Sequence, residues 1–134
     1  MVCIYCGGET QVTNSRLQKK ANRVWRRRHC SSCDGIFTTL EQIDWPTSLL
    51  YKDNSSRVGP FERDILYISV YDSLKHRKKA VSEATALTAT ITAKLLPVIK
   101  DATIQREDTI RVATEVLRRF DKAAAIAYQA FHPL

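Results

Sequence analysis

The chain has 134 residues and a formal net charge of +7. This length allows one ordinary domain, or a small metal-stabilised module followed by a domain of fewer than about 100 residues. No apolar run reaches the roughly 18 residues that span a bilayer, so the sequence argues against a membrane protein, and its basic balance favours a polyanionic partner. Because nothing at the N-terminus resembles a signal peptide, we expect a reducing, cytoplasmic compartment.

The first predicted element is a metal site built from two CxxC pairs, Cys3 with Cys6 and Cys30 with Cys33. A CxxC turn brings two sulfur atoms to one side of a tetrahedral ion, so the spacing predicts a zinc ribbon with four thiolate ligands. A disulfide framework would need an oxidising compartment, and a redox role for one pair would leave the other pair unexplained. Because four thiolates leave no open position, the predicted zinc is structural.

Basic residues are concentrated in the same segment. Residues 1–34 contain seven lysines and arginines against two acidic residues, which accounts for +5 of the total charge of +7. A charge run is often no more than a solvated face, but the strands of a ribbon would hold these side chains in a fixed orientation. We expect contacts with nucleic-acid phosphates, and arginine with guanine if a base is read. The candidate residues are Arg16, Lys19, Lys20, Arg23, Arg26, Arg27 and Arg28.

The composition changes after Glu41. Residues 43–48 include Pro46, which lacks a backbone donor and favours extended geometry in the residue before it. This segment indicates a linker between a first domain at 1–42 and a second domain at 49–134.

The second domain is predicted to be mainly helical with a small sheet. Apolar residues at 49–51 and at 58 flank a polar turn and predict a short β-hairpin. Beyond it, apolar residues recur at spacings of three and four, as Phe61, Ile65 and Ile68 do in the first helix. The expected helices are 60–76, 81–96, 107–119 and 123–131. The fold class is therefore α+β, with a small N-terminal zinc ribbon followed by a mainly helical domain.

No catalytic constellation emerges from the sequence. The carboxylates are scattered, and neither His76 nor His132 has an evident nucleophile. There is no Walker-type Gly-rich loop, since three of the four glycines lie in the ribbon segment. The sequence predicts a protein that is not an enzyme, and any phosphate binding would depend on side chains.

A family resemblance rests on the order of residues in and around the cysteine pairs. Segments 3–6, 14–17, 24–33 and 37–41 resemble the bacterial NrdR family, whose members repress ribonucleotide reductase genes. The motifs are Cys3-Ile4-Tyr5-Cys6, Asn14-Ser15-Arg16-Leu17, Val24-Trp25-Arg26-Arg27-Arg28-His29-Cys30-Ser31-Ser32-Cys33 and Phe37-Thr38-Thr39-Leu40-Glu41. That family joins an N-terminal zinc ribbon to an ATP-cone domain, and the resemblance covers essentially the whole chain.

The resemblance implies a cytoplasmic transcriptional repressor that binds double-stranded operator DNA through the ribbon. It also implies that the second domain is ATP-cone-like and binds ATP or dATP to select among homo-oligomeric states. The DNA contacts that it implies are Arg16, Arg26, Arg27 and Arg28.

The second half follows the outline of the cone but departs from it near the nucleotide. Lys52 matches the lysine after the first strand of the cone. Asp53, however, stands where the family usually places a second basic residue, and Ile65 stands where the first helix usually carries a phosphate-facing lysine. An aromatic residue and an arginine near the nucleotide are here Ala125 and Ala127. Triphosphate binding without a Gly-rich loop needs such cations. The candidate nucleotide-binding residues are Lys52 and Arg57.

These departures leave alternatives open. One is a repressor that responds to nucleotide, and the other is a zinc-ribbon nucleic-acid-binding protein whose degenerate cone mediates self-association without sensing nucleotide. A third, binding to RNA or to a transcription complex, is physically compatible because arginine attraction to phosphate does not distinguish DNA from RNA. A change of assembly on adding nucleotide would separate the first two.

Overall fold

The computed structural model describes residues 1–133. The chain forms two compact units, Met1–Ile43 and Asp44–Leu134, which we call the ribbon unit and the helical unit. Leu134, the last residue of the predicted second domain, lies outside the described residues. Within residues 1–133, no helix is both long enough and apolar enough to cross a membrane.

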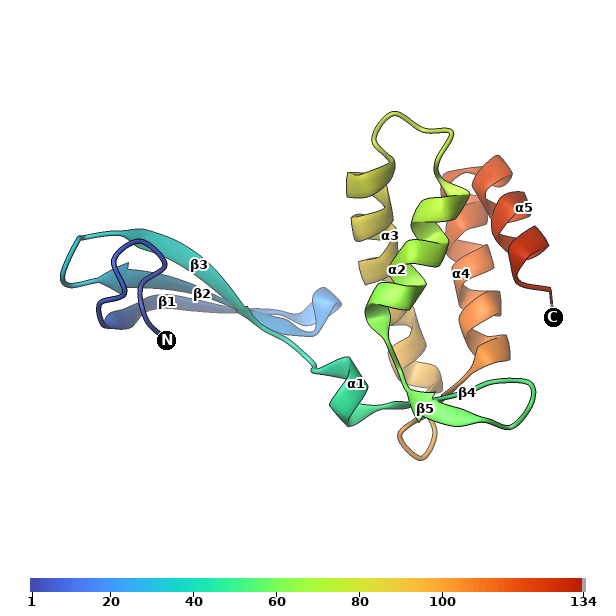
Figure 1. Cartoon of the computed structure of the whole chain (residues 1–134), viewed down its shortest axis with the longest axis horizontal. Helices are drawn as coiled ribbons and strands as arrows, with labels where there is room; N and C mark the ends of the chain where they lie inside the picture. The colour runs from blue at the N-terminus through green and yellow to red at the C-terminus, as the bar shows by residue number, and fades with distance from the viewer. Residues whose placement is uncertain (134) are drawn as a thin grey trace. The chain divides into compact units, whose positions relative to one another are not determined.

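The ribbon unit is a three-stranded antiparallel sheet in the order β1-β2-β3 (Figure 1). Its strands are β1 (Thr10–Gln18), β2 (Arg23–Cys30) and β3 (Ile36–Glu41). A short 3-10 turn, η1 (Lys19–Ala21), and the left-handed Asn22 connect β1 to β2. The buried apolar cluster of this unit consists of Cys3, Cys30 and Phe37. Because so small a cluster buries little apolar surface, we expect metal binding to supply much of the unit's stability.

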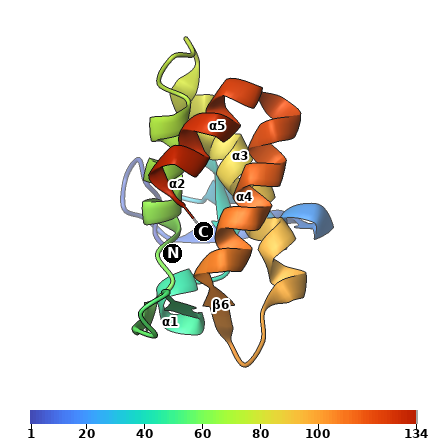
Figure 2. The same cartoon turned by 90° about the vertical axis from the view of Figure 1, so that its right-hand side faces the viewer.

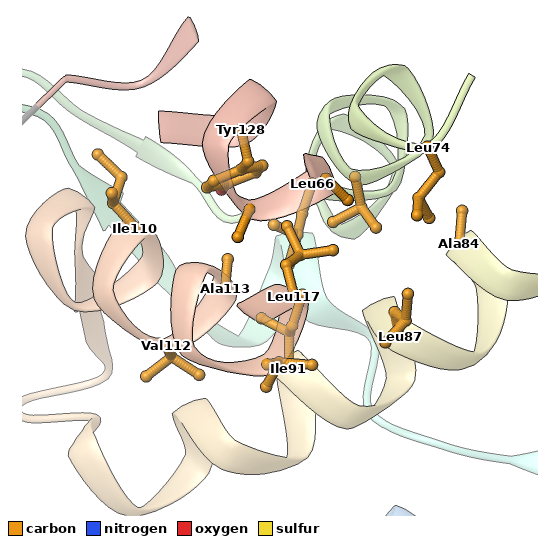
Figure 3. Close-up of a cluster of buried hydrophobic side chains, with 14 of the residues drawn as sticks. Leu66, Leu74, Ala84, Leu87, Ile91, Ile110, Val112, Ala113, Leu117 and Tyr128 are labelled. Atoms are coloured by element: carbon orange, nitrogen blue, oxygen red, sulfur yellow. The ribbon is translucent and has the colours of Figure 1, made fainter. Parts of the chain in front are cut away.

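The helical unit is a closed bundle of four helices (Figures 1 and 2). The helices are α2 (Arg63–Ser73), α3 (Ala80–Leu95), α4 (Arg106–Phe120) and α5 (Lys122–Phe131). Helix α2 packs against α3 and α5, and α4 packs against the same two helices. The core lies between them, and Figure 3 shows its side chains, which include Leu66 of α2, Ile91 of α3, Leu117 of α4 and Tyr128 of α5.

A small mixed sheet lies at one end of the helical unit, next to the start of α4 (Figure 2). Its strands are β4 (Leu50–Lys52), β5 (Val58–Pro60) and β6 (Thr103–Gln105), in the order β5-β4-β6. Strand β4 pairs antiparallel with β5 and parallel with β6. A 3-10 turn, η2 (Leu96–Val98), follows α3. Strand β6 runs directly into α4, so the sheet fixes the position of the first residue of α4, Arg106.

The α+β class is confirmed, but the structure differs from expectation around the predicted linker. Residues 45–48 form a helical turn, α1 (Trp45–Ser48), with Pro46 in its first turn, where the missing N–H has no helical partner to lose. The Trp45 ring packs edge-on against Phe61, with centroids 5.7 Å apart. The segment is therefore part of the packed helical unit. Strand β6 was not expected, since three residues give almost no periodic signal.

Helix α2 buries a different stripe from the one that the sequence singled out. Ile65 and Ile68 are 63% and 55% exposed, whereas Leu66, Val70 and Leu74 are buried. The two exposed isoleucines are three residues apart and the buried residues are four apart, and both spacings are helical, so periodicity alone cannot choose between the stripes. Packing against α3 and α5 selects the stripe of Leu66. Pro60, expected in the first turn of this helix, instead ends β5.

Candidate metal centre and nucleic-acid interface

Two knuckles of the same backbone geometry carry the four cysteines. In the first, the N–H of Gly7 donates to the carbonyl of Cys3 (2.9 Å), and the N–H of Cys3 donates to Gly8 (2.8 Å). The second repeats this pattern with Asp34 donating to Cys30 (3.0 Å) and Cys30 donating to Gly35. The fourth residue after the first cysteine of each pair is left-handed, with φ of 74° at Gly7 and 56° at Asp34.

The four sulfur atoms lie where a tetrahedral zinc ion requires them. All four Sγ atoms lie within 4.8 Å of one another, and the Cys3–Cys33 and Cys6–Cys30 sulfurs are 3.7 and 3.5 Å apart. A tetrahedron with zinc–sulfur bonds of about 2.3 Å has edges of about 3.8 Å. The donor set and its spacing therefore fit structural zinc.

Backbone amides favour the thiolate form of these ligands. The N–H groups of Tyr5 and Gly8 each donate to a cysteine sulfur over 3.4 Å. The backbone N–H of Cys33, followed by that of Ser32, lowers the pKa of the Cys30 thiol to about 6, whereas the neighbouring thiols, that of Cys6 first, raise the pKa of Cys33. Since zinc binds thiolates, these amides prepare the site for the metal.

The two faces of the ribbon sheet carry different arginines. Residues paired directly across an antiparallel sheet share a face. Arg16 pairs with Trp25, which pairs with Leu40, and Arg27 lies two residues beyond Trp25 on the same face. We call this side the Trp25 face. Arg26 and Arg28 lie on the opposite side, which we call the Phe37 face because Arg28 pairs with Phe37.

The arginines of the Phe37 face are bound within the ribbon. Arg26 donates through Nη2 to the carboxylate of Glu41 over 2.7 Å. Arg28 donates through Nε to the hydroxyl of Thr39 (3.3 Å) and through Nη1 to the hydroxyl of Thr10 (3.4 Å). These contacts give both side chains a structural role within the sheet.

The Trp25 face carries arginines that are free to bind a ligand. Arg16 and Arg27 are exposed, and within residues 1–133 neither side chain forms a hydrogen bond or an ion pair. Arg23, at the start of β2, instead donates to the side chain of Gln18 over 2.6 Å. Lys19 and Lys20 are exposed in η1. The predicted cationic residues therefore separate into a free group and a group bound by neighbours.

The candidate phosphate ligands of the helical unit lie on the β4–β5 hairpin. Lys52 ends β4, and Asp53 organises the turn by accepting from the N–H and hydroxyl of Ser55 (2.8 and 2.7 Å) and from the N–H of Arg57 (3.0 Å). The Ser55 hydroxyl, with these amides, lowers the pKa of Asp53. The guanidinium of Arg57 lies 3.4 Å from Asp53 and its side chain is 85% exposed. An anionic ligand would therefore have to displace Asp53 from Arg57.

Arg106 lines two separate hollows. A polar hollow of about 220 Å³ is lined by Lys52, Asp53, Asn54, Ser56, Gln105, Arg106 and Glu107. A more apolar cavity of about 160 Å³ lies between β5, α2, α4 and α5, and its lining includes Phe61, Ile65, Arg106, Ile110, Tyr128 and His132. Figure 3 shows Ile110 and Tyr128, which come from α4 and α5. Tyr128 is 2% exposed and the centroid of its ring lies 4.5 Å from that of the His132 ring.

Sequence reasoning did not connect Arg106, Tyr128 and His132 with a site. The sequence shows no nucleophile for His132, and nothing in the spacing of Arg106 links it to Lys52, more than 50 residues earlier. The pairing of β6 with β4 brings Gln105 opposite Lys52 and so places the next residue, Arg106, beside it. Because the three residues of β6 leave no recognisable pattern in the sequence, the proximity of Arg106 to Lys52 could not be predicted.

A four-thiolate ribbon that exposes arginines on one face defines a nucleic-acid-binding zinc-ribbon protein. Comparison with known proteins makes this specific. A family described as "Transcriptional repressor NrdR-like, N-terminal domain" matches residues 1–41. The chain belongs to the NrdR family of transcriptional repressors, because relatives across nearly its whole length are at least 30% identical to it.

Three relatives illustrate this similarity. Transcriptional repressor NrdR of Variovorax paradoxus (strain S110) is 33% identical over 98% of this chain and 86% of the relative. The protein of the same name from Methylobacterium sp. (strain 4-46) is 32% identical over 98% of this chain and 70% of the relative. That from Polynucleobacter necessarius subsp. necessarius (strain STIR1) is 31% identical over 98% of this chain and 88% of the relative. The predictions of a zinc ribbon, of a repressor and of a non-enzymatic role are confirmed.

Proposed function

We propose that this repressor binds double-stranded operator DNA of ribonucleotide reductase genes through the Trp25 face of its ribbon, in the cytoplasm. The observation that carries the proposal is the division of the arginines between the two faces. Arg16 and Arg27 are exposed and unbound within the described residues, whereas Arg26 and Arg28 are held by Glu41, Thr39 and Thr10.

A DNA duplex would meet the side chains of one face of the ribbon sheet at a time. Successive side chains of a strand point to opposite faces, so one groove or one phosphate strand meets Arg27 without meeting Arg26. Arg16 is a diagonal neighbour of Arg27 across β1 and β2, at about 7–8 Å, so the two guanidiniums can engage neighbouring groups on the DNA. Lys19 and Lys20 add charge at the end of the hairpin.

Nucleotide control is the second part of the proposal. ATP or dATP would place its base in the apolar cavity and its phosphates in the hollow beside Lys52, and binding would change the assembly of a homo-oligomer. Arg57 contributes only if its guanidinium leaves Asp53. Exposed apolar side chains on α2 and α5 supply surface for self-association, namely Ile65, Ile68, Ile126 and Phe131.

The presence of Asp53 favours a second candidate function. A carboxylate beside the phosphate hollow opposes a triphosphate by charge repulsion, as does Glu107. In this alternative the helical unit mediates self-association without sensing nucleotide. Calorimetry and light scattering on the same zinc-loaded sample decide between the two: heat of binding with a change of mass supports nucleotide control, and absence of binding at millimolar ATP and dATP supports the alternative.

Fluorescence anisotropy with a labelled duplex from upstream of ribonucleotide reductase genes tests the DNA face. We expect Arg27→Gln and Arg16→Gln each to weaken binding roughly 5- to 100-fold. The matched control is Arg26→Gln, which removes the same charge from the Phe37 face and should change affinity much less. A larger loss from Arg26→Gln than from Arg27→Gln would assign the DNA to the other face.

Competition at fixed salt separates DNA from RNA. We expect unlabelled operator duplex to displace the labelled duplex at lower concentration than a structured RNA of equal length, because the two duplexes present different grooves and backbones to the same rigid face. Preference for the RNA would contradict the operator proposal while leaving the ribbon a nucleic-acid-binding surface.

A further inference from the structure

The guanidinium of Arg106 is only partly satisfied. Its Nη2 donates to the carbonyl of Pro133 over 3.0 Å. Its Nη1 is fully buried and has no hydrogen-bond partner within residues 1–133. A buried, charged donor without an acceptor is unfavourable and rare in folded proteins, and a water, an ion or a ligand supplies the acceptor. The missing acceptor would carry negative charge or a strong lone pair.

The position of Arg106 identifies what kind of ligand would supply that acceptor. Arg106 is the residue shared by the polar hollow of Lys52 and the apolar cavity of Phe61, Ile110 and Tyr128. A ligand occupying both would need an anionic part beside Lys52 and an apolar, flat part against the cavity wall. A nucleotide has this division, with phosphate at one end and an aromatic base at the other.

The other cations of this region are less available. Arg57 is bound to Asp53, and Lys52 shares the hollow with Asp53 and Glu107. Position 65, on the wall of the apolar cavity, is an isoleucine and supplies no charge. Arg106 therefore combines three properties: positive charge, a buried donor without a partner in the described chain, and a position in the lining of both hollows.

We infer that Arg106 is the principal phosphate-binding residue of this protein, with Lys52 as its partner, and that it takes over a task that the hairpin cations perform only weakly. The inference rests on the proposed nucleotide control and names the residue through which that control acts. A planar guanidinium suits the role because it can offer two parallel N–H donors to one phosphate.

Calorimetric titration of the zinc-loaded full chain with ATP, adenosine and tripolyphosphate tests this inference. We expect Arg106→Gln to weaken ATP binding by about 10- to 100-fold and to abolish tripolyphosphate binding, because a charge-assisted hydrogen bond is lost. Adenosine should bind within about twofold of its wild-type affinity, since the apolar cavity stays intact, and Arg106→Lys should restore part of the ATP affinity. A thermal melt confirms that each variant is folded.

Arg111→Gln is the matched control, because Arg111 lies on the same helix, is 58% exposed and, among residues 1–133, pairs with Asp108 alone. Unchanged ATP affinity in Arg106→Gln overturns the inference and leaves nucleotide control standing. Equal losses for adenosine and ATP also overturn it, since they indicate a collapsed cavity. Tripolyphosphate binding that depends on Arg106, without ATP binding, keeps Arg106 as a phosphate ligand and overturns nucleotide control. No binding of any of the three overturns both.

Discussion

Gly35, the residue that closes the second cysteine knuckle, leaves no room for a side chain. A Cβ at this position would lie 2.5 Å from Cδ2 of Tyr5 and 3.1 Å from Sγ of Cys33. Tyr5 is itself packed edge-on against Phe37, with ring centroids 6.2 Å apart.

We predict that Gly35→Ala weakens zinc binding about tenfold or more, because displaced supporting groups misalign the thiolates. Competition with a chromophoric chelator measures the affinity. Gly59→Ala, whose Cβ meets no atom within 4 Å, should leave zinc affinity unchanged. A comparable loss in both variants would contradict a steric cause.

At the scale of elements, one ionic cluster joins the ends of the four helices. Asp121, between α4 and α5, accepts from Nε2 of His76 (3.0 Å) and from Nη1 of Arg77 (2.9 Å). Arg77 also donates twice to Glu83 at the start of α3 and lies over the ring of Phe120, 4.7 Å from its centroid. The cluster fixes the α2–α3 connection against the α4–α5 corner.

Asp121 also caps the N-terminus of α5, accepting from the N–H of Ala124 over 3.1 Å. We predict that Asp121→Ala lowers the Tm of the helical unit by about 5 °C or more, because it removes the cap and the ion pairs together. Asp121→Asn, which keeps a cap acceptor, should lose less. Thermal melts followed by circular dichroism at 222 nm measure both. Asp72→Asn, which removes an exposed pair with Lys75, is the control and should have little effect.

The same cluster predicts an acid transition. The hydrogen bond from His76, followed by that from the backbone of Ala124, holds the pKa of Asp121 well below its usual value of 3.8. A carboxyl with a depressed pKa stabilises the fold above its unfolded pKa and loses that contribution as pH falls towards the folded value. We predict that the Tm of the helical unit falls below about pH 4, and that it falls less steeply in Asp121→Asn. Parallel slopes in the two proteins would assign the transition to other carboxyls.

Some features of the fold and of the candidate sites could be predicted from the sequence, and others could not. The cysteine spacing and the four helical segments were predictable because a CxxC turn and a helix of ten or more residues each leave a local signal. The burial of Leu66 in place of Ile65 was not, since two stripes on α2 share the same period. The placement of Arg26 and Arg27 on opposite faces, with different partners, could not be predicted, because it depends on the tertiary contacts and register of the strands. The approach of Arg106 to Lys52 could not be predicted either, because it depends on a parallel pairing of three residues.

At the scale of the whole molecule, the two units have separate cores, one around the cysteines and one between the helices. We predict that chelating zinc under reducing conditions unfolds the ribbon unit and abolishes DNA binding, while the helical unit stays folded. The signal at 222 nm should change little, because α2 to α5 lie in residues 63–131. Each unit holds one tryptophan, so Trp25→Phe and Trp45→Phe variants let fluorescence follow the units one at a time. Loss of the helical signal together with the metal would show that the two cores depend on each other.

The free arginines of the Trp25 face bear on which side of the ribbon would meet the DNA. A surface that presents Arg16 and Arg27 on one side and bound arginines on the other would turn one defined face towards the DNA. Two such ribbons related by a two-fold axis would read an inverted repeat, whereas two ribbons related by translation would read a direct repeat. On the proposed mode of binding, the orientation and spacing of half-sites in the operator would report the symmetry of the bound assembly.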